Sequence, residues 1–103
     1  EDTLSGVVIG TPLYMSPDQV KGKQVDHRAD IYSIGVIFYE MASGRPPFTE
    51  GDLSYQHMFV EPKPLKNVPE AFTKLTMKCL AKKPDERWQS VQEILDELKT
   101  IEA

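Results

Sequence analysis

The stretch from Asp30 to Ala42, DIYSIGVIFYEMA, decides the fold of this chain. At helical spacing its apolar side chains cover almost the whole circumference, and only Ser33 and Glu40 form a thin polar seam. Each large apolar side chain contributes about 1.5 to 3 kcal/mol when it is buried, so such a helix belongs inside a core. A membrane span would need roughly 20 apolar residues, which is longer than this stretch. The pattern therefore predicts a central core helix over residues 28–43, ended by Gly44 and the prolines after it.

Size and composition limit what the rest of the chain can be. The chain has 103 residues, a formal net charge of −4 and one cysteine. This length allows one small domain with a single core, and the acidic balance argues against a nucleic-acid-binding face. Cys79 falls in line with Phe72 and Leu75 on one helical face, which predicts a buried structural thiol. His27 and His57 have no partners at ligand spacing, so we expect no metal site.

Capping and proline signals predict four further helices around the central one. Residues 1–15 have no helical period and are expected to be an extended loop, with a short strand possible over residues 7–9. Asp26 is the expected cap of the core helix. Serine capping boxes and Asp52 mark further helix starts, and prolines make residues 60–69 a loop. The expected additional helices cover residues 16–21, 53–59, 70–81 and 91–101. The predicted fold is mainly α, with about five helices and no internal repeat.

The order of four short motifs is more specific than the helical pattern. They are GTPLYMSPD (residues 10–18), DIYSIGV (30–36), GRPPF (44–48) and KPDERW (83–88). Together they resemble the latter part of a eukaryotic-type Ser/Thr protein kinase domain. The local amino-acid sequence is similar to that of the bacterial members of the family. The resemblance implies a single partial kinase domain over residues 1–103. Residues 1–15 would be the activation segment and substrate loop, and residues 16–103 the helical part of the large lobe (C-lobe).

The resemblance also implies roles for the N-terminal residues. The expected substrate-docking residues are Gly10, Thr11, Pro12, Leu13 and Tyr14. Thr3 and Ser5 lie where activating phosphorylation occurs in the family, and the alternative for each is an ordinary loop hydroxyl. A phosphate there would add a charge of about −1.5 to −2 and could order the loop.

A structural ion pair between Asp18 and Arg87 is implied in the same way. In the family a glutamate occupies the first position, so the shorter aspartate leaves open a direct, a water-bridged or an absent contact. The alternative is that Asp18 only complements the N-terminus of its own helix. Asp30 matches the family residue that caps the backbone of the catalytic loop. Because that loop is not in this chain, we expect Asp30 to cap its own helix.

Several motifs that phosphoryl transfer requires do not occur in the sequence. Catalysis needs a glycine-rich loop, a lysine on a strand, a catalytic aspartate and a magnesium-binding aspartate, and the chain contains no GxGxxG, HRD or DFG. The first hypothesis is therefore a fragment of a Ser/Thr kinase that is inactive alone. ATP and Mg²⁺ would be cofactors of the parent enzyme only, with none bound in this chain.

The partners and location follow from this hypothesis. The expected partners are a protein substrate and the missing N-lobe and catalytic loop, with no nucleic acid and no membrane segment. The implied location is cytoplasmic, and a membrane tether on the parent is left open. Because the core helix would lack part of its cover, we expect a homodimer through its exposed surface or through an exchanged N-terminal segment. A free-standing, non-catalytic protein-binding module derived from a kinase lobe is the alternative function, and an unrelated small helical bundle is a third interpretation.

Overall fold

The computed structural model describes residues 12–22 and 25–102 of the chain. Its helices follow one another as η1 (Pro12–Tyr14), α2 (Pro17–Lys21), α3 (Arg28–Ser43), α4 (Leu53–Phe59), α5 (Glu70–Cys79), η2 (Pro84–Glu86) and α6 (Val91–Glu102). The described ranges contain α-helices and short 3-10 turns but no strand, which confirms the mainly α prediction. The possible strand over residues 7–9 lies outside the described residues.

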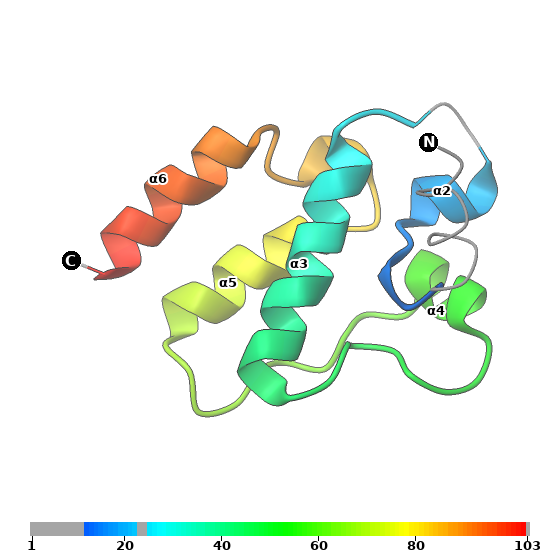
Figure 1. The fold of residues 1–103 in the computed structure, drawn as a ribbon, viewed down its shortest axis with the longest axis horizontal. Coiled ribbons are helices and arrows are strands. Elements are labelled where there is room, and N and C mark those ends of the chain that lie inside the picture. The colour runs from blue at the N-terminus through cyan, green and yellow to red at the C-terminus, as the bar shows by residue number, and fades with distance from the viewer. Residues whose placement is uncertain (1–11, 23–24, 103) are drawn as a thin grey trace.

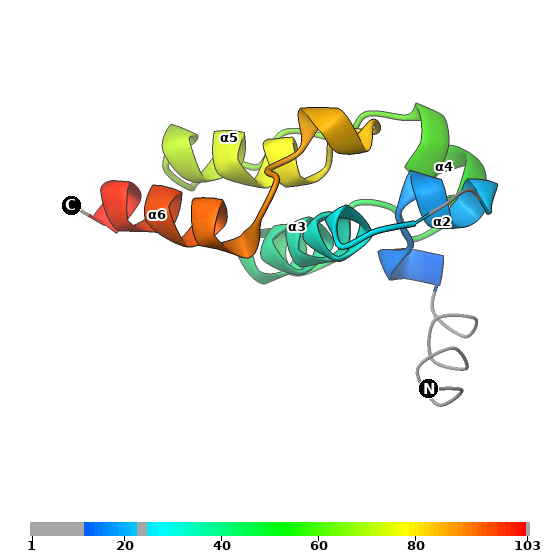
Figure 2. The same ribbon diagram turned by 90° about the horizontal axis from the view of Figure 1, so that it is seen from above.

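The long helix α3 is the centre of the arrangement, as the sequence predicts. Figure 1 shows α5 and α6 on one side of α3 and α2 and α4 on the other, and Figure 2 shows the same division from above. Because α3 contacts helices on both sides, it separates an α5–α6 side from an α2–α4 side.

The predicted caps explain where two of the short helices begin. Ser16 and Gln19 form a complete capping box: the Gln19 amide donates to Ser16 Oγ over 3.2 Å, and the Ser16 amide donates to Gln19 Oε1 over 2.8 Å. At α4 the Tyr55 amide donates to Asp52 Oδ1 over 3.0 Å. These bonds satisfy amide groups that the first turn of a helix leaves without partners.

Two other helix starts differ in detail from the predicted caps. His27 occupies the N-cap position of α3 without a side-chain cap, and Asp26 accepts instead from the Arg28 amide over 2.9 Å. At α6 the Glu93 amide donates to Ser90 Oγ, but the Glu93 carboxylate accepts from the Gln89 amide rather than from Ser90. Asp26 thus caps the first amide of α3, whereas the Glu93 carboxylate binds an amide one residue before the expected one.

Two segments depart from the predicted boundaries. Helix α5 ends at Cys79 rather than at residue 81, because Leu80 already closes the turn with backbone bonds to Thr76 and Met77. Residues 12–14 form a 3-10 turn where an extended loop was predicted. Proline fixes the backbone of the first residue, and Ser33 binds the carbonyl of the last.

The closest packing joins α3 to α5. Ile31, Leu75, Cys79 and Ile94 form one buried apolar cluster. A Cβ on Gly35 would lie 2.5 Å from Cys79 Cβ, so only glycine allows the two helices to approach this closely. The Cys79 side chain is fully buried, and burial raises the pKa of its thiol to about 12. The predicted burial of this thiol is confirmed.

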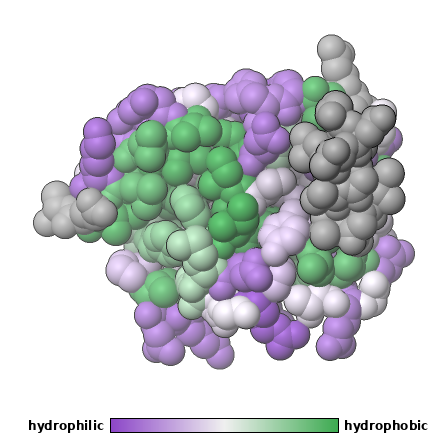
Figure 3. Space-filling view, in the orientation of Figure 1, coloured by the Kyte–Doolittle hydropathy of each residue, from purple (hydrophilic) through white to green (hydrophobic). Residues whose placement is uncertain are grey.

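One part of α3 remains at the surface. Ile37 is 45% exposed and Met41 is 74% exposed, and α6 contributes the exposed apolar residues Val91 and Leu95. Figure 3 shows apolar surface gathered over these two helices. Among the helices of residues 12–22 and 25–102, none has the length and apolar content that a membrane crossing requires.

Candidate functional site

The segment that precedes α2 is attached to the polar seam of α3. Ser33 Oγ donates to the carbonyl oxygen of Tyr14 over 2.8 Å, and the Tyr14 hydroxyl donates to Glu40 Oε1 over 2.7 Å. The bond to Glu40, followed by burial and the carboxylate charge, raises the pKa of Tyr14. Both polar residues of the seam therefore hold one tyrosine. The sequence reveals the seam but not its partner, because Tyr14 comes from a separate motif.

The other expected docking residues divide between described and undescribed parts of the chain. Pro12 begins η1, and Leu13 is its half-buried middle residue. Gly10 and Thr11 lie outside the described residues, as do the candidate phosphorylation sites Thr3 and Ser5. The structure thus places the second half of the expected docking segment.

Asp18 and Arg87 lie in direct contact although 69 residues separate them. Arg87 Nη2 is 2.7 Å from Asp18 Oδ1, and Nη1 is 3.3 Å from Oδ2, so the pair is bidentate. The side chain of Arg87 is 0% exposed and that of Asp18 is 9% exposed. Two parallel bonds between planar groups fix both distance and orientation. The shorter aspartate side chain therefore still reaches the guanidinium.

The Arg87 guanidinium also binds three backbone carbonyls. Nε donates to Ala81 over 2.8 Å, Nη1 to Arg28 over 2.9 Å and Nη2 to Lys82 over 3.2 Å. A guanidinium has five N–H donors, and these bonds together with the two to Asp18 use all of them. A buried cation is tolerated only when it is paired and fully hydrogen-bonded. Arg87 meets this condition, and it joins α2, the start of α3 and the loop after α5.

The electrostatics of Asp18 follow from this contact. Burial alone would raise the pKa of the Asp18 carboxyl, but the hydrogen bond and charge of Arg87 hold that pKa below its ordinary value. Asp18 also lies in the first turn of α2, where a carboxylate is favoured by the helix dipole. The direct contact with Arg87 therefore excludes the alternative that Asp18 only complements its own helix, although the carboxylate also occupies that favourable position.

Asp30 is found in the first turn of α3 but not as its cap. The residue is exposed, and its side chain makes no hydrogen bond to the described residues. The first amide of the helix is taken by Asp26, so the cap that was expected of Asp30 lies four residues earlier. Asp26, which precedes the helix, accepts from the Arg28 amide, and Asp30 contributes only its negative charge in the first turn.

A buried pair that the sequence does not reveal joins α3 to α4. The Tyr32 hydroxyl lies 2.8 Å from His57 Nδ1, and both residues are 0% exposed. The Arg87 guanidinium carbon lies 5.2 Å from the centre of the Tyr32 ring. In the sequence, His57 is a polar residue in a helix of mixed composition. This feature is too weak to predict that its partner is Tyr32.

A metal ion finds no fitting set of ligands among the described residues. The described residues contain no group of three or more His, Cys, Asp or Glu side chains that could hold a metal ion. Mg²⁺ prefers several oxygen ligands in octahedral geometry. No catalytic step is therefore assigned to a metal held by these residues.

Comparison with known proteins extends the resemblance over almost the whole chain. A family model described as a protein kinase domain matches residues 2–98. A probable serine/threonine-protein kinase of Clostridium acetobutylicum is 41% identical over 106 residues, which cover 96% of this chain and 16% of that protein. The serine/threonine-protein kinase PknB of Mycobacterium tuberculosis strain H37Rv is 39% identical over 107 residues, which cover 96% of this chain and 17% of that protein.

A third relative gives the same result over a shorter stretch. The DNA damage-responsive serine/threonine-protein kinase RqkA of Deinococcus radiodurans is 42% identical over 95 residues, covering 85% of this chain and 14% of that protein. The chain thus spans about a sixth of the length of the curated relatives that it matches. With four ordered motifs, a mainly helical fold and a family match from residue 2 to residue 98, this chain belongs to the protein kinase domain family.

Proposed function

We propose that this chain is the substrate-docking and structural part of a Ser/Thr protein kinase. The complete protein would transfer the γ-phosphate of ATP to Ser or Thr of a protein substrate, with Mg²⁺ as metal cofactor. Residues 1–15 would form the activation segment and residues 16–103 the helical base. The observation that carries this proposal is the double attachment of residues 14–18: Tyr14 binds Ser33 and Glu40, and Asp18 binds Arg87.

This part of the kinase would position the peptide substrate. A peptide substrate reacts efficiently only when its hydroxyl is held in line with the phosphate. The segment from Tyr14 to Asp18 is bonded at both ends, and Pro12 and Leu13 lead directly into it. The 103 residues contain no GxGxxG, HRD or DFG motif, so we expect no phosphoryl transfer from this chain alone.

A chimera tests the proposal. Residues 1–103 would replace the matching segment of PknB from Mycobacterium tuberculosis, and phosphorylation of a Ser/Thr peptide would be followed with radiolabelled ATP. We expect the chimera to transfer phosphate, and Asp18→Asn to raise KM for the peptide more than KM for ATP. A folded chimera without transfer, or equal changes in both KM values, would contradict the proposed docking role.

The coding sequence before Glu1 separates this proposal from the alternative module. Codons for a glycine-rich loop, a strand lysine and a catalytic aspartate would support the kinase. A start codon directly before Glu1 would instead support a free-standing protein-binding module. The apolar residues on α3 and α6 are compatible with either, because both functions require that this face be covered.

The exposed face of α3 and α6 defines a further part of the proposal. Ile37, Met41, Val91 and Leu95 would contact the rest of the kinase domain in the complete protein, and a second copy when the chain is studied alone. Exposed apolar surface of several hundred Å² drives such association. Sedimentation equilibrium should show a dimer that Met41→Glu shifts to monomer, whereas a sharp monomer at high concentration would exclude the dimer.

A further inference from the structure

The Arg87 guanidinium makes one close contact beyond its hydrogen bonds. Its five N–H donors form a fixed planar fork and bind Asp18 and three backbone carbonyls. The same group packs over the Tyr32 ring, with the guanidinium carbon 5.2 Å from the ring centre, which is within the range of a cation–π contact. Tyr32 is 0% exposed and Arg87 is 1% exposed. The position of the Tyr32 ring is therefore part of what holds Arg87 in place.

The far end of the Tyr32 ring is held by α4. The ring projects from α3, and its hydroxyl lies 2.8 Å from His57 Nδ1. The two rings meet edge to face, with their centres 5.6 Å apart and their planes at 71°. Burial raises the pKa of the Tyr32 hydroxyl, so the hydroxyl stays protonated at neutral pH. An apolar side chain at position 57 could pack there but could not bind this hydroxyl, which costs free energy when it is buried without a partner.

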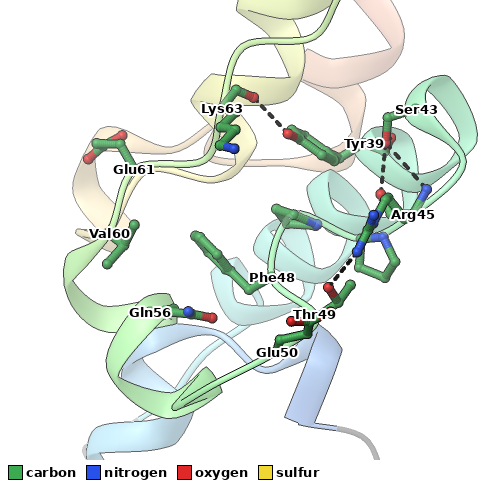
Figure 4. Close-up of a pocket in the computed structure, with 12 residues that line it drawn as sticks. Tyr39, Ser43, Arg45, Phe48, Thr49, Glu50, Gln56, Val60, Glu61 and Lys63 are labelled. Atoms are coloured by element: carbon green, nitrogen blue, oxygen red, sulfur yellow. Dashed lines mark hydrogen bonds between the residues drawn. The ribbon is translucent and has the colours of Figure 1, made fainter.

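A second set of contacts joins α4 to Arg87. Phe48 meets His57 edge to face with ring centres 5.3 Å apart, and Figure 4 shows its side chain pointing from the loop after α3 toward the segment of α4. The Lys82 amine lies 5.0 Å from the centre of the Phe48 ring and donates to the Gln56 carbonyl of α4 over 3.1 Å. The Lys82 carbonyl accepts from Arg87 Nη2 over 3.2 Å. Lys82 therefore binds α4 with its side chain and Arg87 with its backbone.

These contacts close into a ring in which each residue touches the next. Its members, in order, are Arg87, Tyr32, His57, Phe48 and Lys82. A displacement of α4 must move either the Tyr32 ring or Lys82, and both contact Arg87. Close-packed interiors transmit such displacements, and buried hydrogen-bond networks strengthen one another. The closed ring thus provides a direct route from α4 to the guanidinium that binds Asp18.

We infer that Tyr32 and His57 are positioning residues for the peptide substrate. They hold the Arg87 guanidinium where it meets Asp18, and thereby hold one end of the segment from Tyr14 to Asp18. The inference rests on the proposed function, which makes this segment part of the docking site. Neither residue belongs to the segment, and each acts through Arg87. The buried histidine of α4 thus has a role that apolar packing alone would not require.

Hydrogen exchange on the ¹⁵N-labelled 103-residue chain tests the contact with Arg87. The reporter is the Arg87 Nε–H group, which donates to the Ala81 carbonyl over 2.8 Å. The reference is Trp88 Nε1–H, which donates to the Leu75 carbonyl over 3.0 Å on the α5–α6 side. We expect Tyr32→Phe to speed exchange at Arg87 by about fivefold and to leave Trp88 within about twofold of the parent chain, because only the local contact opens. Equal acceleration at both groups, or no change at Arg87, would overturn the inference.

Two substitutions at His57 separate a hydrogen bond from the filling of space. Asparagine carries a donor and an acceptor near the position of Nδ1, so His57→Asn keeps a partner for the Tyr32 hydroxyl, whereas His57→Leu removes it. We expect His57→Leu to speed exchange at Arg87 as Tyr32→Phe does, and His57→Asn to stay within about twofold of the parent chain. Tyr55→Phe is the matched control on α4, because Tyr55 is 54% exposed and should change neither group. Equal effects of leucine and asparagine would contradict the role of the hydrogen bond.

The chimera described above tests the consequence for the substrate. There His57→Leu should raise KM for the peptide about threefold or more, with kcat and KM for ATP within about twofold, and His57→Asn should restore the lower value. An unchanged peptide KM in an active chimera would overturn the inference and leave the proposed function intact. A folded chimera without transfer would instead contradict the proposed function. Hydrogen exchange involves no phosphoryl transfer, so it would still decide whether His57 holds Arg87.

Discussion

The two sides of α3 are held by different physical means. On the α5–α6 side, Ile31 packs with Leu75 and Cys79 in a buried apolar cluster. On the α2–α4 side, Tyr32, Ser33 and Glu40 each bind a polar partner. Apolar packing depends on volume and has no direction, whereas hydrogen bonds require matched donors and acceptors. The comparison teaches that one helix can depend on matched volumes on one side and on matched donors and acceptors on the other.

The largest effect is expected from breaking the polar side at Arg87. Arg87→Met leaves the Asp18 carboxylate and the carbonyls of Ala81, Arg28 and Lys82 without their donor. Removing one partner of a buried ion pair costs about 3 to 5 kcal/mol, a large share of the stability of a small domain. Urea unfolding measures this loss. Lys74→Met, at an exposed lysine, should change stability by less than about 0.5 kcal/mol, and a similar small change for Arg87→Met would contradict the role of the pair.

The apolar side should be most sensitive at Gly35. Gly35→Ala places a methyl group against Cys79 Cβ, where only 2.5 Å is available. Overpacking costs about 1 to 3 kcal/mol, and the better helix propensity of alanine offsets about 1 kcal/mol of that cost. Thermal unfolding should show net destabilisation. The double variant with Cys79→Gly should recover part of it, and strict additivity of the two changes would refute a direct clash.

The pH dependence of stability should distinguish the two sides through Asp18. Its native pKa is lowered from the ordinary 3.8, so the unfolded chain binds this proton more readily. The resulting stabilisation is complete well above the unfolded pKa and is lost as the pH falls through the native pKa. Urea unfolding at about pH 6 and about pH 3 should show a smaller loss for Asp18→Asn than for the parent chain. An identical acid loss in both proteins would assign the effect to other carboxylates.

The smallest effect is expected at the tyrosine that ties the docking segment to α3. Tyr14→Phe removes one hydrogen bond to Glu40, which contributes about 0.5 to 1.5 kcal/mol. Glu40→Gln should cost less, because the amide oxygen still accepts from the Tyr14 hydroxyl. A double-mutant cycle between Tyr14→Phe and Glu40→Ala, each of which removes the bond, measures the coupling by urea unfolding. A coupling of zero would mean that the hydroxyl bond does not hold the segment in solution.

Much of the apolar side could be predicted from the sequence. The near-continuous apolar run over residues 28–43 predicts α3 with the boundaries that the structure shows, and the spacing of Phe72, Leu75 and Cys79 predicts the buried face of α5. Local capping signals at Ser16 and Asp52 place the starts of α2 and α4. These features depend on neighbours within a few residues, and periodicity is a direct record of which face is buried.

The polar side was less accessible to the same reasoning. The pairing of Asp18 with Arg87 was expected only from the resemblance to protein kinases, and the partners of Tyr32 and Glu40 were not anticipated. Asp30 was expected as a cap, but Asp26 takes the first amide of α3. The pairings of Asp18, Tyr32 and Glu40 depend on which atoms of distant segments come within about 3 Å of each other. Spacing along a sequence does not contain that information.

By itself the sequence determined the helical class, the central helix, the buried thiol and the polar seam of Ser33 and Glu40, because period and composition encode burial directly. Only the tertiary structure decided that the seam binds Tyr14 and that Arg87 uses all five of its N–H donors. It also decided that Gln56 Oε1 is buried without a hydrogen-bond donor among the described residues. Burial is an average property that a local pattern can carry. A hydrogen bond requires a donor and an acceptor at a defined distance and angle, and only the folded chain brings two distant groups together in this way.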